Sequence, residues 1–227
     1  MAPTRFMCAL VILDAVEQHV LPGLGAQAPE LIWDPTAALM KRIMAGETAD
    51  GICAIEASVD QLVADGLVDP ASVRPVVQAE FGIAISRDWP APKLETGDDL
   101  KALLLEVPSI CYSRAGASGI YFETLIDRLG IGDEVRAKSL VIPAGLTGEK
   151  VRDGETVLAI QQMSELLAVD GIRIVGALPR GWQQNTDFAA GVFTRAQNRA
   201  GAQAFIDALV SPAAREAYLA RGLNVRF

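Results

Sequence analysis

Strands and helices alternate three times within the first eighty residues, and this alternation limits the fold more than any other feature. Apolar runs typical of buried strands, each followed by helical spacing, occur at residues 5–10, 30–33 and 51–55. Pro35 disfavours a helix at Asp34, and Thr36 is suited to cap the helix that follows. Such alternation favours parallel βαβ units with right-handed crossovers. The sequence therefore predicts an α/β fold.

The middle of the chain indicates a second α/β unit. A long predicted strand at 76–86 leads into a Pro-rich turn, as expected of a segment that crosses between two lobes. Further strands are predicted at 109–112, 157–161 and 172–178. A return crossing is expected at 188–194, after which helices at 198–222 pack back on the first lobe. The predicted domains are therefore residues 1–81 with 195–227, and residues 82–194.

Composition excludes several classes of protein. The 227 residues are 51% hydrophobic, which is enough apolar content for one large core or two lobes of about a hundred residues. The chain carries a formal net charge of -8. Lys and Arg are scattered and form no basic stripe, so nucleic acid is not expected as a partner. No apolar run is long enough to span a membrane, so membrane insertion is not expected either. We expect a monomer.

The N-terminus and the cysteines indicate in which cellular compartment the protein is expected. Residues 1–8 are too short and too polar for a secretory signal, which predicts either a trimmed periplasmic protein or a cytoplasmic one. Cys8, Cys53 and Cys111 are odd in number and lie in apolar runs, which fits a reducing compartment slightly better. With no CxxC and one histidine, we expect no disulfide framework, no metal and no cofactor.

Four strand-to-helix junctions are candidates for an anion site. Ligands of open α/β sheets bind beyond the carboxyl ends of the strands, where helix N-termini present N–H groups. Two junctions fall in each predicted lobe, and they contain Ala9-Leu10, Thr36-Ala37, Ser118-Gly119 and Leu146. The hydroxyls of Thr36, Ser113 and Ser118 would add donors, and Gly119 would allow close approach of the backbone. Each junction is equally well interpreted as an ordinary capped turn, so the prediction rests on their order along the chain.

Several segments carry a family resemblance. The stretches PTAALMKRIMAGETADG, SRAGASGIYFETLIDRLGI, GETVLAIQQMSEL and the C-terminal SPAAREAYLARGL resemble the molybdate-binding-like branch of periplasmic (type II) solute-binding proteins. This resemblance covers essentially the whole chain. It implies two Rossmann-like α/β lobes joined by two crossing strands, and a small anionic ligand held between them. It also implies the membrane component of an ABC transporter as a partner.

The sequence departs from molybdate binders where they contact the oxyanion. Their first strand leads into a serine, whereas CALVIL supplies no hydroxyl, and Gln162 stands where their tyrosine would be. Loss of two donors argues against molybdate. Gln162 with Gln161, Ser164 and Arg114 instead suggests a carboxylate, since amides donate and accept and Arg binds carboxylates bidentately. The QQMSELL variant resembles the sub-branch that includes aconitate isomerase.

Three functions remain open on the sequence. The first is a solute-binding protein that clamps a small organic carboxylate between two lobes. The alternative is an aconitate-isomerase-like enzyme acting on an unsaturated organic acid, for which Glu165 is the one candidate base; the sequence has no familiar catalytic motif. The third is a molybdate- or tungstate-type oxyanion binder, or a cytosolic sensor.

Overall fold

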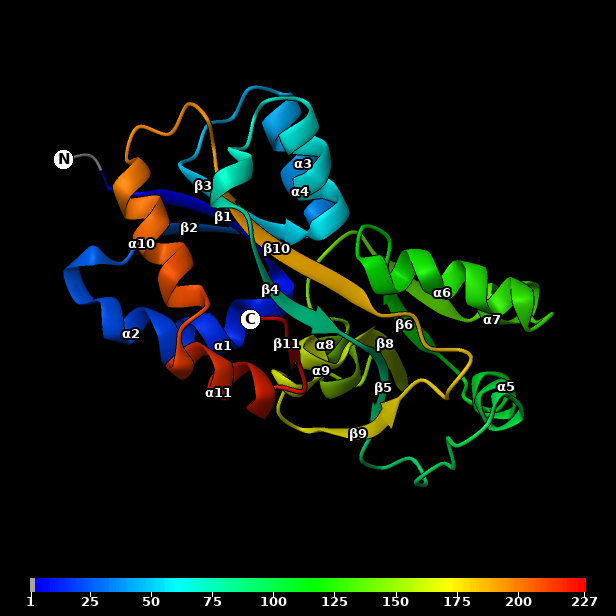
Figure 1. Ribbon diagram of the computed structural model, residues 1–227. Coiled ribbons are helices and arrows are strands. Elements are labelled where there is room, and N and C mark those ends of the chain that lie inside the picture. Colours follow the sequence, from blue (N-terminus) through cyan, green and yellow to red (C-terminus); the bar gives the residue numbers. More distant parts are fainter. Residues whose placement is uncertain (1–2) are drawn as a thin grey trace. The chain divides into compact units, whose positions relative to one another are not determined.

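The computed structural model describes residues 3–227 and shows two α/β units (Figure 1). Unit 1 combines the chain up to Ala79 with Thr186–Phe227, and unit 2 is Glu80–Asn185. The second boundary lies nine residues before the predicted 194/195. The reason is that strand β10, Thr186–Val192, already pairs with strands β3 (Gly51–Ile55) and β4 (Arg74–Ala79) of unit 1.

The sheet of unit 1 is mixed. Its strand order within the described residues is β11-β4-β10-β3-β1-β2. The strands not yet delimited are β1 (Arg5–Ala9), β2 (Glu30–Asp34) and β11 (Asn224–Val225). Strand β1 is parallel to both β2 and β3, whereas β10 is antiparallel to β3 and β4. The predicted parallel βαβ arrangement is therefore confirmed for the first three strands.

Helices cover both faces of this sheet (Figure 1). One face packs on α3 (Thr36–Met44) and α4 (Glu56–Ala64). The other face packs on α1 (Leu13–Ala15), α2 (Leu21–Leu24), α10 (Arg199–Leu209) and α11 (Pro212–Ala220). Along β1 the side chains alternate between these cores: Phe6 and Cys8 face one and Met7 the other.

The sheet of unit 2 has the order β7-β6-β8-β5-β9 in the described chain. Its strands are β5 (Phe81–Ser86), β6 (Ile110–Ser113), β7 (Ser139–Ile142), β8 (Leu158–Gln162) and β9 (Ile172–Ala177). Strand β6 is parallel to β7 and β8, and β5 is antiparallel to β8 and β9. Consequently β6, β7, β8 and β9 all end at one edge, which we call the carboxyl edge of unit 2.

Helices also cover both faces of the second sheet. One face packs on α5 (Gly97–Glu106), α6 (Ala117–Arg128) and α7 (Gly132–Ala137). The opposite face packs on α8 (Thr147–Arg152) and α9 (Met163–Leu167). The two apolar cores of unit 2 are consistent with a buried sheet between helical layers.

Some predicted boundaries were wrong for local reasons. The long strand at 76–86 is two strands, β4 and β5, which separate at Glu80 and enter different sheets. The predicted first helix is an irregular run of 3-10 (Leu10–Ile12), α and π (Val16–Val20) turns that ends near Leu24. Thr36 is not a cap: helix α3 begins with it, after Pro35.

The cysteines are reduced and buried in the structure. Cys8 and Cys53 are register partners on β1 and β3, and burial raises the pKa of Cys53 to about 12. Burial likewise raises the pKa of Cys111 to about 12, so none of these thiols is poised to react. None of the helices in residues 3–227 combines the length and the hydropathy needed to cross a bilayer.

Candidate functional site

The carboxyl edge of unit 2 brings together most of the predicted ligand-binding side chains. Strand β6 ends at Ser113 and β8 ends at Gln162, and the two strands are parallel neighbours with Cys111 opposite Ala159. Ser118 and Gly119 follow in the first turn of α6, and Ser164 lies in the first turn of α9. The loops after neighbouring strands therefore present hydroxyl and amide groups along one edge.

Two serines flank the turn that leads into α6. The N–H of Gly116 donates to Ser113 Oγ at 3.0 Å, which fixes that hydroxyl. A Cβ added at Gly116 would meet Ser113 Oγ at 2.4 Å and Ser118 Oγ at 3.7 Å, so both hydroxyls lie beside this glycine. Ser118 is 1% exposed and its hydroxyl makes no hydrogen bond to any described residue. Ser118 is thus a donor still available for a ligand.

Gly119 has a packing role that the sequence did not predict. A Cβ at this position would lie 1.7 Å from the main-chain oxygen of Ser113, so only glycine allows α6 to approach the end of β6. The close approach that we predicted for a ligand is made by the strand itself. Helix α6 begins at Ala117, because residues 113–116 already complete the turn.

Arg114 points to solvent at the same edge. Its main-chain N–H donates to the oxygen of Ile142 at 2.8 Å and so continues the pairing of β6 with β7. The residue is exposed, and its guanidinium forms no ion pair or side-chain hydrogen bond within residues 3–227. Its position leaves it able to contact an anion.

The loop that contains the predicted backbone site at Leu146 is fixed by hydrogen bonds of the neighbouring residues. Leu146 packs against the apolar core beneath α8, and the N–H of the next residue, Thr147, donates to Gln161 Oε1 at 2.7 Å. Gln161 Oε1 also accepts from the Thr147 hydroxyl at 2.8 Å, and its Nε2 donates to Gly145 O at 2.9 Å. Gln161 thus fixes the loop before α8, a role that sequence patterns do not reveal.

Gln162 lies deep at the end of β8. It is 4% exposed and forms a capping box with Glu165 at the start of α9, although its Oε1 has no well-formed hydrogen bond. Buried polar groups without partners are uncommon in proteins and require an explanation. Ser164, in the next turn, is also buried. Gln162 therefore offers a second polar group that a ligand could satisfy.

Glu165 is the titratable group of this edge. Its carboxylate accepts from the Gln162 N–H at 3.3 Å, and Gln161 donates a further side-chain hydrogen bond. Desolvation outweighs these hydrogen bonds and raises the pKa of Glu165 from 4.5 to about 7. A carboxyl group with a pKa near neutrality can both accept and donate a proton at physiological pH.

The four predicted residues of unit 1 lie at the carboxyl ends of β1 and β2. Ala9 and Asp34 are register partners there, Leu10 begins the 3-10 turn, and Ala37 follows Thr36 in α3. The Thr36 hydroxyl accepts from the N–H of Ile55 at 3.2 Å, at the end of β3. Ala9, Leu10 and Ala37 have no polar side chain. This edge can therefore contribute mainly backbone groups and one hydroxyl that is already engaged.

The described residues show no cluster of three or more His, Cys, Asp or Glu side chains that could hold a metal. The groups at the carboxyl edge of unit 2 are hydroxyls, amides, a guanidinium and one carboxyl. Such groups can bind an anion by hydrogen bonds and charge.

The sequence matches the model of a known protein family over most of its length. Residues 29–224 match the model of bacterial extracellular solute-binding proteins, and the chain belongs to that family. A curated relative, an aconitate isomerase of Pseudomonas sp, is 33% identical over 214 residues, which cover 94% of this chain and 81% of the relative.

Solved structures show the same fold at low identity. The periplasmic molybdate-binding protein of Azotobacter vinelandii matches with a TM-score of 0.81 and 16% identity, over 99% of this chain and 100% of that chain. The sulfate-binding protein SubI of Mycobacterium tuberculosis H37Rv matches with a TM-score of 0.70 and 15% identity, over 98% and 86% of the two chains. The predicted resemblance to the molybdate-binding-like branch and the two-lobed α/β fold are thereby confirmed.

Proposed function

We propose that this protein binds a small organic carboxylate, with the loops at the carboxyl edge of unit 2 supplying the contacts that select it. The observation that supports this most is the pair of polar groups without partners at the edge of unit 2, Ser118 Oγ and Gln162 Oε1. A carboxylate would accept from the hydroxyl, and Arg114 would add charge. The amide of Gln162 can accept from a hydroxyl of an organic acid such as citrate through Oε1 and donate to a carboxylate through its NH2 group.

The curated relative supports the same ligand class, because the name of that relative identifies aconitate, a tricarboxylate, as its substrate. Unit 1 would contribute backbone groups near Ala9, Leu10 and Ala37, with Thr36. The absence of a hydroxyl after β1 argues against molybdate, since unmatched contacts are how such sites discriminate between ligands.

A ligand screen tests this proposal. Thermal unfolding with cis-aconitate, trans-aconitate, citrate, molybdate and sulfate should show stabilisation by the organic acids. A ligand at a hundred times its Kd adds about 2.7 kcal/mol to the free energy of unfolding. Calorimetry that found submicromolar affinity for molybdate or tungstate, with none for the organic acids, would contradict the proposal.

A second candidate, isomerisation of an unsaturated organic acid, is favoured by Glu165. Moving a double bond next to a carboxylate requires a base that removes a proton from carbon and an acid that returns it. A carboxyl group with a pKa of about 7 suits both steps, and it lies within three residues of Gln162.

Proton NMR of cis- and trans-aconitate in deuterated water tests the enzyme candidate. Isomerisation predicts interconversion or deuterium uptake that is lost in Glu165→Gln. It should persist in Glu134→Gln, which replaces an exposed glutamate of α7. Unchanged spectra with the wild-type protein would rule out this activity on aconitate and leave ligand binding as the function.

The family also suggests a setting for this activity. We propose that the protein acts in the periplasm and delivers its ligand to the membrane component of an ABC transporter. Ligand-dependent stimulation of ATP hydrolysis by a reconstituted transporter would test this partnership. Absence of stimulation by the liganded protein, with a transporter that responds to its own receptor, would contradict it for that transporter.

A further inference from the structure

A pocket of about 550 Å³ lies at the carboxyl edge of unit 2, beside the candidate anion site: the N–H of Met163 donates to the oxygen of Glu80 at 2.9 Å, and Phe81 is the register partner of Gln162. It is formed by Ala177 at the end of β9, by Leu178, Arg180, Gly181, Gln183 and Asn185 in the segment that follows, and by Glu80 before β5. It shares no residue with the set proposed above for the organic carboxylate. Its volume lies in the range of pockets that hold small molecules, about 300–1,000 Å³.

The wall of this pocket is held firmly by main-chain and side-chain contacts. Gln183 Oε1 accepts from the N–H of Phe81 at 3.0 Å, and its Nε2 donates to the oxygen of Phe81 at 2.8 Å. Leu178 N–H donates to the same oxygen at 3.0 Å. Both ends of the Gln183 amide are thus hydrogen-bonded to the main chain of Phe81. The side chain forms part of the pocket wall and is not expected to bind a ligand.

The segment that carries Arg180 is also anchored on α6. Tyr121 donates its hydroxyl hydrogen to the oxygen of Trp182 at 2.7 Å, and the guanidinium of Arg128 lies 4.8 Å from the centre of the Trp182 ring. A Cβ at Gly97 would lie 2.2 Å from Trp182 Nε1, so this ring packs closely on the start of α5. The segment after β9 is therefore ordered by several contacts before any ligand binds.

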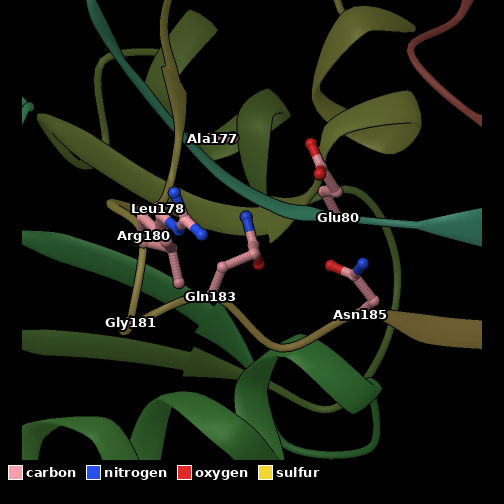
Figure 2. Close-up of a pocket in the computed structure, with 7 residues that line it drawn as sticks. All are labelled: Glu80, Ala177, Leu178, Arg180, Gly181, Gln183 and Asn185. Carbon is pink, nitrogen blue, oxygen red and sulfur yellow. The ribbon is translucent and has the colours of Figure 1, made fainter.

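Two opposite charges face this pocket without meeting each other. Figure 2 shows Arg180 on one side and Glu80 on the other, with Gln183 between them. Neither forms an ion pair or a side-chain hydrogen bond with any residue from 3 to 227. Elsewhere in unit 2 Arg136 is paired with Glu123 and Asp127, at 2.8 and 2.7 Å. The pocket thus contains a cation and an anion that are not paired with each other.

We propose that this pocket binds a small zwitterion of the amino-acid type, with its carboxylate on Arg180 and its ammonium group on Glu80. The guanidinium fits a carboxylate bidentately, and the Glu80 carboxylate accepts from an ammonium group. The apolar Ala177 and Leu178 would contact the carbon chain between the two charges. A ligand with only one charged end would leave the opposite protein charge unmatched and would bind more weakly.

The pocket is lined by residues near both ends of unit 2. Glu80 is the first residue of unit 2, and the segment that carries Arg180 leads to Thr186, where unit 1 resumes. A ligand that contacts Glu80 and Arg180 together would link the two connecting segments of unit 2. The zwitterion is therefore expected to stabilise unit 2.

Calorimetry with a homologous series of ω-amino acids tests the proposal. Glycine, β-alanine, γ-aminobutyrate and 5-aminovalerate place the two charges at increasing separation, so affinity should pass through a maximum along the series. Butyrate and butylamine, which carry one charge each, should bind at least about tenfold more weakly than the best zwitterion. Arg180→Gln and Glu80→Gln should each weaken that zwitterion by about tenfold or more. Arg195→Gln, which removes an exposed charge of unit 1, should have no effect.

A charge swap distinguishes ligand contact from structural damage. The double variant Arg180→Glu with Glu80→Arg should restore affinity for the best zwitterion to within about threefold of wild type, because the ligand can bind in the reverse direction. Affinity for organic acids at the carboxyl edge should stay unchanged in every one of these variants. The proposal is overturned if no member of the series binds below about 10 mM, or if the single variants bind it as well as wild type.

Discussion

Each unit has a sheet edge at which parallel strands end, but the two edges carry different polar side chains. In unit 1 the ends of β1 and β2 present Ala9 and Leu10, and the one hydroxyl, that of Thr36, accepts from the N–H of Ile55. In unit 2 the ends of β6 and β8 present Ser118 and Gln162, each with a polar atom that has no partner in the described chain.

This difference suggests that the two edges affect ligand binding in different ways. Backbone N–H groups attract any anion, whereas side chains with directed donors and acceptors select one ligand over another. Unit 1 would therefore contribute general attraction to an anion, and unit 2 would determine which acid is bound. Changes at unit 2 should alter specificity, and changes at unit 1 should mainly alter stability.

The largest expected effect is at Gly119. Its replacement by alanine places a methyl group on the Ser113 oxygen, and we expect a loss of about 3 kcal/mol or more in the free energy of unfolding. The control is Gly23→Ala in α2 of unit 1, where nothing lies within 4 Å of the new Cβ; it should stabilise by about 0.5–1 kcal/mol. Urea denaturation measures both, and equal effects would contradict the packing role of Gly119.

The pH dependence of stability should report on Glu165. Its pKa is raised from 4.5 to about 7 in the folded protein, so the folded state holds a proton that the unfolded state has lost. Its contribution is complete below pH 4.5 and falls as pH rises through 7, by about 3 kcal/mol in total. Urea denaturation from pH 4.5 to 8 should show this decline in wild type relative to Glu165→Gln. Parallel curves for the two proteins would refute the shifted pKa.

The neighbouring glutamines offer a matched pair within unit 2. Gln161→Leu leaves the Thr147 N–H and the Gly145 oxygen without their partner, and should cost about 2 kcal/mol of stability. Gln162→Leu removes an Oε1 that has no well-formed hydrogen bond together with one side of the capping box of α9, and should cost less stability than Gln161→Leu while weakening ligand binding. Chemical denaturation and calorimetry on both variants separate the two roles; a larger stability loss at Gln162 would reverse our assignment.

A small effect is expected in the core of unit 1. The Tyr218 hydroxyl is buried with no hydrogen-bond partner, close to Cys8 and Cys53. Tyr218→Phe removes this unsatisfied group and should raise the free energy of unfolding by up to about 1 kcal/mol. Thermal unfolding of the variant measures this. A clear loss of stability would show that the hydroxyl has a favourable role that the structure does not reveal.

Apolar runs and glycines predicted most strands within one or two residues. Gly51–Ile55 was predicted without error, and the run at residues 172–178 became β9. The run at 76–86 was misread because both halves are apolar, and the break at Glu80 depends on which sheet each half joins. Such long-range pairing leaves no local pattern in the sequence.

The candidate site was predicted in its residue types but not in its contacts. The strand-to-helix junctions pointed to Ser118 and the family resemblance pointed to Gln162; both lie at the carboxyl edge of unit 2, and their role in binding stays a prediction. The engagement of Thr36 by Ile55, nineteen residues away, and the packing of Gly119 on Ser113 both arise from tertiary structure. The raised pKa of Glu165 depends on desolvation, which a sequence does not show.

Calorimetric titration of trans-aconitate into two matched variants tests the central claim most directly. Ser118→Ala removes an unpaired hydroxyl of unit 2, and should weaken binding by about tenfold or more with unchanged stability. Thr36→Val removes the hydroxyl that pairs with Ile55 in unit 1, and should cost about 1 kcal/mol of stability with affinity within about twofold of wild type. The opposite result, with affinity lost in Thr36→Val and retained in Ser118→Ala, would contradict the assignment of specificity to unit 2.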